Sequence, residues 1–342
     1  MLTRKGCTKK VFITGVAGFL GSHLADRLID KGHTVCGVDN LTGGNLDNVN
    51  PAVEFHNVDC SDLNAIRQYM QGSDVVFHAA CAAHEGLSVF SPYYITKNTF
   101  QNSISVISAA VELGVKKFVY CSSMSRYGMQ SKLPYTEDMI CHPQVPYGIA
   151  KYAVEQVLAS LASLNHMIYT IVVPHNIIGP RQNYTDPYRN VAAIMINRML
   201  QGKQPIIYGD GNQKRCFSVI DDVIVCIENV IENNFDGEVI NIGPDEEYIS
   251  INQLAACIGK ELNFEVCPIY VNDRPLELKF AYCSSDKARR LLGYRTQTSL
   301  QEGLKAMVEY IQKRGPQPFE YSRYPLEIIR QNTPKTWASH LI

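Results

Sequence analysis

Short apolar runs alternate with helical patterns along the first half of the chain. Runs rich in Val, Ile and Phe predict strands at 10–14, 34–39, 53–58, 74–80, 117–122 and 168–173. Helical spacing between these runs predicts helices at 19–31, 62–70, 95–113 and 148–165. Near-continuous apolar strands that alternate with helices are typical of a parallel sheet covered on both faces. We therefore expect an α/β fold with a doubly wound parallel sheet.

The alternation becomes irregular after about residue 175. Helical patterns reappear at 191–201, 219–233, 251–262, 285–292 and 299–313, with short strands predicted at 206–208, 238–242 and 266–270. We expect a first domain at 1–175 and a smaller mixed α/β lobe at 176–314, with some later segments returning to the first domain. Residues 315–342 are rich in aromatic side chains and include the only tryptophan, Trp337, which predicts a tail packed on the body.

The bulk composition excludes several classes of partner. The net charge is −1 over 342 residues, so no global field favours nucleic acid or an anionic membrane. No apolar segment has the length of a membrane span. The 11 cysteines are scattered and form no C-x-x-C, which predicts small buried residues in a reducing compartment and neither a disulfide framework nor a metal site. We expect a cytoplasmic protein.

A glycine-rich loop follows the first predicted strand and opens the first predicted helix. Gly15, Gly18 and Gly21 are spaced three apart, which permits a tight turn and close approach of the backbone to a pyrophosphate at the helix N-terminus. Asp39 ends the second predicted strand, where a carboxylate accepts hydrogen bonds from an adenosine ribose and repels a 2′-phosphate. No arginine follows Asp39 closely, so the sequence favours NAD over NADP.

Tyr147 and Lys151 lie one helical turn apart on the same predicted helix face. A neighbouring ammonium favours the phenolate and lowers the pKa of a tyrosine, and a serine hydroxyl such as that of Ser123 can hydrogen-bond the same oxygen. The three groups together could exchange a proton near neutrality. Spacing alone is weak support, because a tyrosine and a lysine one turn apart are common on helix surfaces.

These pieces occur in an order that resembles the extended short-chain dehydrogenase/reductase family, in particular its nucleotide-sugar epimerase and dehydratase branch. Further matching pieces are Asp59, His78-Ala79-Ala80, Tyr127-Gly128, Asn176-x-x-Gly179-Pro180-Arg181, Tyr208-Gly209-Asp210-Gly211, Arg215, Asp221-Asp222-Val223 and Arg274-Pro275. The resemblance runs from residue 14 to about 295. It implies an NAD-binding Rossmann domain at 1–175 and a mixed α/β substrate lobe at 176–314 that binds the nucleotide-sugar. It also implies Ser123, Tyr147 and Lys151 as the catalytic residues.

The resemblance also implies the binding residues. The cofactor would contact Gly15, Gly18, Phe19, Leu20, Asp39, Asn40, Asp59, Cys60, Ala79, Ala80, Asn98, Tyr147, Lys151 and Pro174. The substrate would contact Glu85, Ser123, Asn176, Arg181, Asn190, Val191, Ile206, Tyr208, Arg215, Arg274, Glu277 and Ala281. His78 and Tyr127 are interpreted as structural.

Departures from the family pattern narrow the substrate. The acid pair that follows this serine position in the 4,6-dehydratases is replaced by Met124 and Ser125, which weakens that alternative. Arg126 either pairs with a nearby carboxylate, such as Glu137 or Asp138, or serves an acidic substrate; we favour the pair. Arg181 could bind the carboxylate of a uronic acid, whereas Glu85 would repel that carboxylate. The two residues therefore give opposite indications about an acidic substrate.

Ala281 occupies the position where a bulky aromatic residue restricts the related epimerases to plain hexoses, which predicts room for an N-acetyl group at C2. We expect an NAD-dependent 4-epimerase of UDP-N-acetylglucosamine, UDP-glucuronate or UDP-glucose. The alternatives are a dehydratase, decarboxylase or reductase of the same family, and a non-catalytic nucleotide-binding protein. Relatives pair through two long helices, here 95–113 and 148–165, so we also expect a homodimer.

Overall fold

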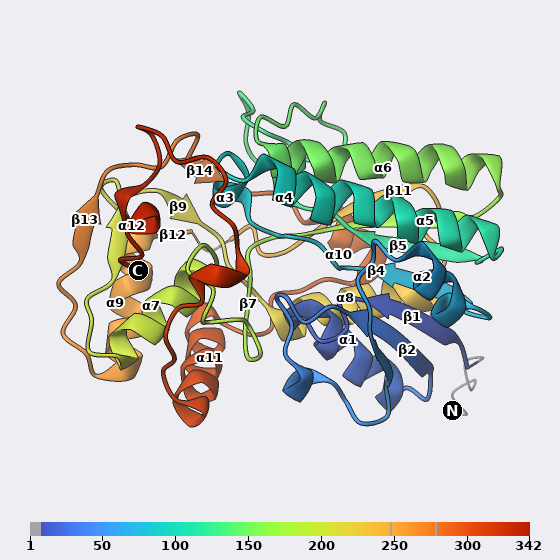
Figure 1. The fold of residues 1–342 in the computed structure, drawn as a ribbon, viewed down its shortest axis with the longest axis horizontal. Coiled ribbons are helices and arrows are strands. Elements are labelled where there is room, and N and C mark those ends of the chain that lie inside the picture. The colour runs from blue at the N-terminus through green and yellow to red at the C-terminus, as the bar shows by residue number, and fades with distance from the viewer. Residues whose placement is uncertain (1–7, 247, 278) are drawn as a thin grey trace.

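The computed structural model describes residues 8–246, 248–277 and 279–342. A large sheet flanked by helices forms one part of the molecule, and a smaller lobe of helices and short strands lies against it (Figure 1). Cys7 lies outside the described residues. Among the described residues, no helix has both the length and the apolar character needed to cross a membrane.

The large sheet has seven strands, all parallel, in the order β11-β6-β5-β4-β1-β2-β3. Their bounds are β1 (Lys10–Thr14), β2 (Thr34–Asp39), β3 (Glu54–Asn57), β4 (Val75–His78), β5 (Lys117–Cys121), β6 (Ile168–Pro174) and β11 (Glu238–Ile242). β1 lies between β2 and β4, so the strand order reverses beside it. The predicted parallel, doubly wound sheet is confirmed, and its carboxyl ends share one edge.

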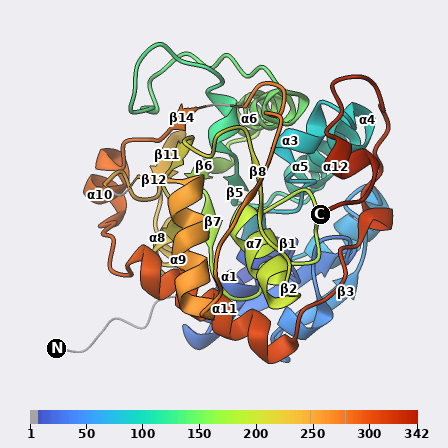
Figure 2. The same ribbon diagram turned by 90° about the vertical axis from the view of Figure 1, so that its left-hand side faces the viewer.

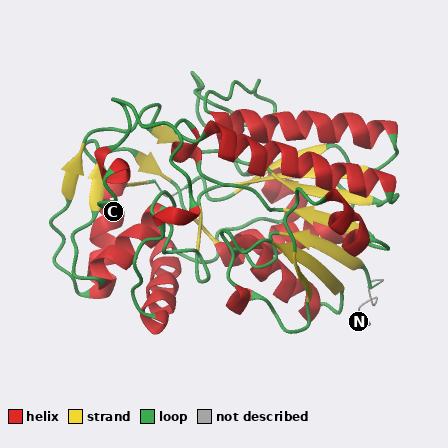
Figure 3. Ribbon diagram, in the orientation of Figure 1, coloured by secondary structure: helices red, strands yellow, loops and turns green. Residues whose placement is uncertain are grey.

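Helices cover both faces of this sheet (Figures 1 and 3). One face carries α1 (Phe19–Asp30), α8 (Ile220–Glu232) and α10 (Asp286–Leu292), and the other carries α2 (Leu63–Met70), α4 (Pro92–Thr96), α5 (Asn102–Glu112) and α6 (Pro146–Leu164). The helix predicted at 95–113 is interrupted by a π-helical stretch at 97–101 between α4 and α5. Two apolar cores fill the layers, one on each face of the sheet.

Segments from the second half of the chain also contribute to the large sheet and its helices. β11 pairs with β6 at the sheet edge, and α8 packs beside α1. The remaining segments build the lobe from α7 (Val191–Leu200), α9 (Ile251–Leu262) and α11 (Leu300–Arg314). Three small sheets complete it: β7 (Ile177–Ile178) with β10 (Ser218–Val219), β8 (Ile206–Tyr208) with β13 (Ile269–Val271), and β9 (Lys214–Arg215) between β12 (Ile249–Ser250) and β14 (Phe280–Ala281).

The carboxyl-terminal tail, residues 315–342, lies against the rest of the molecule (Figure 2). Its short helix α12 (Lys335–Ala338) buries Trp337, which is 1% exposed. Burial of the cysteines is only partly as predicted. The ten cysteines of the described ranges are free thiols, and Cys257 and Cys267 are exposed, so burial was wrong for these two.

A buried ion pair joins the loop after β5 to α6. Arg126 Nη2 lies 2.8 Å from Glu155 Oε2, and the Ser122 hydroxyl donates to the same carboxylate. The prediction of an ion pair was right, but neither Glu137 nor Asp138 is the partner, because Glu155 lies one turn beyond Lys151 on the inner face of α6. The pair therefore fixes the segment that carries Ser123 against the helix that carries Tyr147.

We predict that Glu155→Leu lowers the free energy of unfolding by about 3–5 kcal/mol, because it leaves the buried Arg126 charge without its partner. The double variant Arg126→Met/Glu155→Leu should regain most of this loss, since an apolar pair carries no desolvation cost. Urea denaturation measures both. Glu112→Leu, which breaks the exposed pair with Arg67, is the control and should cost about 0–1 kcal/mol. Equal losses in the two single variants would contradict the prediction.

Candidate active site

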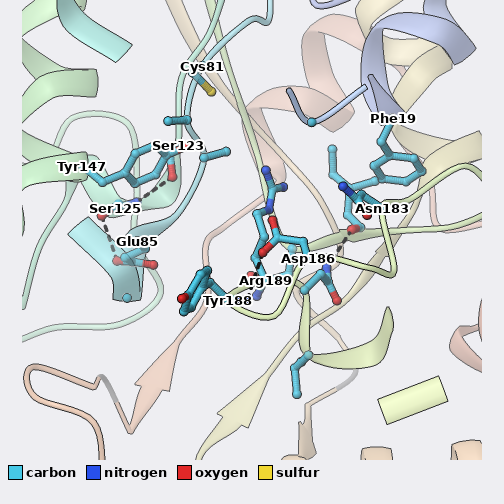
Figure 4. Close-up of a pocket in the computed structure, with 18 of the residues that line it drawn as sticks. Phe19, Cys81, Glu85, Ser123, Ser125, Tyr147, Asn183, Asp186, Tyr188 and Arg189 are labelled. Atoms are coloured by element: carbon cyan, nitrogen blue, oxygen red, sulfur yellow. Dashed lines mark hydrogen bonds between the residues drawn. The ribbon is translucent and has the colours of Figure 1, made fainter. Parts of the chain in front are cut away.

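A cavity of about 600 Å³ lies along the carboxyl edge of the large sheet and is closed on its other side by the lobe. Figure 4 shows Ser123, Ser125, Tyr147 and Glu85 on one side and Phe19 and Asn183 on the opposite side. Every predicted site residue except Asp59 and Arg181 lines this cavity. The structure thus brings together segments that are more than 250 residues apart in the sequence.

The glycine loop packs so closely on neighbouring backbone that side chains at its glycines would collide with it. A Cβ on Gly21 would lie 2.2 Å from the Gly15 carbonyl oxygen, and one on Gly15 would lie 3.0 Å from the Ala80 nitrogen. α1 starts at Gly18 without a side-chain cap and has no acidic residue in its first turn, so its N–H groups stay available to an anion. This cradle fits the diphosphate of a dinucleotide.

Asp39 lines the cavity at the end of β2 and is held in place by backbone donors. The Leu41 and Ala17 N–H groups donate to its two carboxylate oxygens at 2.8 and 3.1 Å. Burial raises the pKa of Asp39, and these backbone hydrogen bonds act in the opposite direction. Asp59 lies just outside the cavity lining and accepts a 2.6 Å hydrogen bond from Asn40, so it orients a residue of the cavity wall.

His78, at the end of β4, is structural as interpreted. Its ring nitrogens contact Thr14 Oγ1 at 2.6 Å and Ser103 Oγ at 2.8 Å. Burial lowers the pKa of His78 to about 3, and the nearby Lys151 charge adds to this effect. A neutral imidazole with both nitrogens occupied has no role left in proton transfer.

Tyr147 and Lys151 come from the first turns of α6, which opens with Pro146 at a position that needs no backbone donor. The Lys151 ammonium donates to the Cys121 carbonyl at 2.7 Å and lies 5.9 Å from the centre of the Tyr147 ring. Ser123 lies at the end of β5 and accepts from the Ser125 N–H at 3.2 Å. The three predicted catalytic residues therefore meet in one cavity.

The pKa of Tyr147 is set by opposing effects. Burial raises the pKa of the phenol, whereas the charges of Lys151 and Arg189 lower it. Lys151 acts in the predicted direction, but the net pKa lies above the ordinary value because burial outweighs both charges. Each of these cations therefore favours the phenolate that can accept a proton.

The opposite end of the cavity carries a bridged pair of arginines. Glu277 accepts from Arg215 at 2.9 Å and from Arg274 at 2.6 Å. Burial alone would raise the pKa of Glu277, but the two guanidinium groups outweigh it and hold that pKa below its ordinary value. The Arg274 guanidinium also lies over the Tyr208 ring, with Arg274 Cζ 5.0 Å from the ring centre. This arrangement fixes two forked cations, as a diphosphate requires.

Glu85 projects into the cavity at the start of α3 (Glu85–Ser88). The Ser125 hydroxyl donates to its carboxylate at 2.8 Å. Burial raises the pKa of Glu85, although its side chain remains open to the cavity. An acceptor of this kind suits sugar hydroxyl groups.

The structure does not bring Arg181 to this cavity. Its guanidinium lies 2.7 Å from the carboxylate of Asp26, on α1. Asn190 lines the cavity but also caps α7 by accepting from the Ala192 N–H at 3.0 Å. Asn176 donates to the Cys216 carbonyl at 3.0 Å, and Asn98 donates to the Tyr94 carbonyl at 2.8 Å, so both amides have structural partners too.

Several cavity residues were missed by sequence reasoning. Asp186, Tyr188, Arg189, Tyr324 and Trp337 all line the cavity. Asp186, Tyr188 and Arg189 lie within the four residues before Asn190, which was predicted to contact the substrate. This polar and aromatic stretch beside a predicted site residue could have indicated that they line the cavity. Asp186 accepts from His84 at 2.6 Å, and both side chains are buried. Tyr324 and Trp337, in the tail, belong to no motif, so nothing in the sequence indicated that the fold brings them to the cavity.

Comparisons with known proteins agree with this geometry. The model of the NAD-dependent epimerase/dehydratase family matches residues 11–243. A Methanocaldococcus jannaschii protein named as a UDP-glucose 4-epimerase is 34% identical over 89% of this chain and 99% of its own length. The Thermotoga maritima UDP-glucose 4-epimerase, solved with UDP-glucose, is also 34% identical, with a TM-score of 0.85 over 89% of this chain and 99% of that one.

A third similar protein is the UDP-glucuronic acid 4-epimerase of Bacillus cereus, solved with UDP-glucuronic acid and NAD. It is 29% identical, with a TM-score of 0.83 over 89% of this chain and 99% of that one. The NAD dependence of the matching family agrees with the cofactor predicted from Asp39 and the glycine loop. These similarities show that the chain belongs to the NAD-dependent epimerase/dehydratase family.

Proposed function

We propose that this protein is an NAD-dependent 4-epimerase of a UDP-sugar. The observation that carries the proposal is one cavity with the glycine cradle at one end, Ser123, Tyr147 and Lys151 along its side, and the bridged pair Arg215 and Arg274 at the other end. In such a site NAD supplies reversible acceptance of hydride. The cradle and Asp39 would hold it, and the arginines would hold the diphosphate of the substrate.

The side chains account for the proton transfer. Tyr147 as phenolate takes the proton of the C4 hydroxyl group while hydride leaves C4, and Ser123 donates a hydrogen bond to the reacting oxygen. Lys151 and Arg189 favour the phenolate electrostatically. After the 4-keto sugar has turned over in the cavity, Tyr147 would return the proton to the C4 oxygen as C4 receives the hydride on its opposite face from NAD held by the cradle. No atom is gained or lost in the cycle.

The residues of the cavity favour a neutral sugar. Arg126 and Arg181, which could have served an acidic substrate, pair with Glu155 and Asp26 instead. Glu85 places a carboxyl group in the cavity, which repels a uronic acid when ionised. Ala281 also lines the cavity, and its small side chain supports room for a C2 substituent. We therefore place UDP-N-acetylglucosamine first, UDP-glucose second and UDP-glucuronate third.

We expect the purified protein to convert UDP-N-acetylglucosamine into its C4 epimer, with proton NMR showing the exchange and mass spectrometry showing no change in mass. Tyr147→Phe should lower the rate by about 10²–10⁴-fold, because it removes the proton acceptor. Tyr152→Phe is the matched control on the same helix and should keep the rate.

Three outcomes contradict the proposal in different ways. Loss of water or carbon dioxide from the substrate identifies a dehydratase or a decarboxylase. Turnover of UDP-glucose without UDP-N-acetylglucosamine or UDP-glucuronate removes the argument from Ala281. Unchanged activity of Tyr147→Phe removes the proposed role of Tyr147 in proton transfer.

The pH dependence should report the two cations near Tyr147. The rate rises with pH as the phenol loses its proton, and loss of a cation raises the pKa of Tyr147. The rising limb of the pH–kcat profile should therefore move to higher pH in Lys151→Met, and by a smaller amount in Arg189→Met, because the Lys151 effect is the larger. Arg290→Met, an exposed control on α10, should leave the limb in place. An unmoved limb in both test variants would exclude this electrostatic role.

We also propose a homodimer in the cytoplasm. α5 and α6 lie beside each other over one face of the sheet (Figure 1). Ile107 and Val154 are fully buried beneath them, but Phe100, Ile104, Val111, Val157 and Leu161 stay partly exposed. A second copy could cover this face by two-fold pairing of the same two helices.

Light scattering should give twice the chain mass of 38.3 kDa. Ile104→Arg should shift the protein to one chain mass while its bound NAD and melting profile persist, because a charge cannot be buried at a paired apolar face. A wild-type protein that stays at one chain mass at micromolar concentration would overturn the dimer.

A further inference from the structure

The carboxyl-terminal tail contacts both parts of the molecule across the cavity. On the large domain, Ser91 Oγ donates to the Pro325 carbonyl at 2.6 Å, and Glu327 accepts from the Tyr94 N–H at 2.8 Å. On the lobe, Asn197 donates to the Gln317 carbonyl at 2.9 Å. Figures 1 and 2 show the tail, drawn in red, running from the lobe towards α3 and α4. This tail lies beyond the residues that the family model matches.

Trp337 packs the tail against aromatic side chains of the rest of the molecule. Its ring meets Tyr188 at 5.1 Å and Phe90 at 5.8 Å, both edge to face. A Cβ on Gly86 would lie 3.4 Å from the Trp337 ring and 3.2 Å from Arg274 Nη1, so this glycine lets both groups pack against α3. The indole therefore adjoins the helix that carries Glu85.

A chain of contacts leads from the tail to the bridged arginines. Thr336 Oγ1 and the Tyr208 hydroxyl lie 2.7 Å apart, and the Trp337 ring lies 6.3 Å from the Tyr208 ring. Arg274 stacks over Tyr208 and pairs with Glu277. Each residue restricts the orientation of the next. The positions of Thr336 and Trp337 therefore influence the orientation of the Arg274 guanidinium, which would hold a diphosphate.

Tyr208 depends on the tail for its orientation. It belongs to the three-residue strand β8, whose one partner strand among the described residues is the equally short β13. A strand pair of this size is marginal by itself, and the ring of Tyr208 is held at its tip by Thr336 and on its face by Arg274. Removing the tail contact would free the ring and, with it, the stacked cation.

We propose that the tail is a nucleotide-positioning segment: Thr336 and Trp337 orient Tyr208 and Arg274 for the UDP part of the substrate. The inference rests on the proposed function, since it names the segment that completes the nucleotide end of that site. Thr336 and Trp337 are positioning residues, because they act through Tyr208 and Arg274 and need not touch the reacting atoms. The glycine cradle lies at the other end of the cavity and does not depend on them.

The test is UDP binding by isothermal titration calorimetry to the full-length, NAD-loaded protein. Thr336→Val keeps the side-chain shape but removes the hydroxyl, so the Kd for UDP should rise about 2- to 10-fold, the range of one net hydrogen bond. Trp337→Ala should raise it further. Thr336→Ser should restore wild-type binding, and Ile329→Ala, at an exposed tail position, should change nothing.

Kinetics separate positioning from simple stability. We expect KM for the UDP-sugar to rise in Thr336→Val while kcat and the bound NAD stay at wild-type levels. If the melting temperature falls and UDP binding does not change, the tail is only structural and the proposal is overturned. Thr336→Val alone decides this if Trp337→Ala fails to fold. A wild-type protein that binds no UDP overturns the proposed function as well, whereas normal UDP binding in every variant overturns the tail role alone.

Discussion

The parallel direction of all seven strands is the constraint on which the site depends. Parallel strands end at a common edge, so Asp39, His78, Cys121 and Pro174 lie along one line although they are far apart in sequence. The reversal of strand order beside β1 opens this edge at the glycine loop. The loops after these strands therefore lie at the same edge of the sheet, where the lobe covers them. Cofactor cradle and catalytic helix are neighbours for this reason.

Within that edge, burial and charge oppose each other at Tyr147. A buried phenol resists ionisation, yet a proton acceptor must ionise. Two cations oppose the effect of burial: Lys151 is itself buried and donates to the Cys121 carbonyl, and Arg189 lines the same cavity. In a cavity of low polarity these charges act more strongly than they would at the surface. Under the proposed function, the lobe residues that line the cavity therefore contribute to the proton transfer.

Local patterns predicted the central strands β1, β4, β5 and β6 well because these strands are mostly buried and apolar and are separated by clear helical spacing. Asp39, Ser123 and Tyr147 were predictable because each stands at a fixed place relative to a strand or a helix. Arg126 and Arg181 were harder. Their charge is visible in the sequence, but their partners, Glu155 and Asp26, are set by packing between elements. Trp337 reaches the cavity only because the tail folds back over both parts.

Glu277 shows why an acid can belong in a site for an anion. A lone pair of arginines would repel each other and pay a large desolvation cost, whereas the carboxylate between them offsets both effects. A guanidinium has five donors, and Glu277 takes two from Arg274, so the acid orients the fork without exhausting it. Tyr208 then sets the plane of that fork by stacking beneath it. If this end holds a diphosphate, as proposed, the affinity depends on how well the fork is preorganised, since immobilising a flexible arginine during binding would cost part of the interaction it forms.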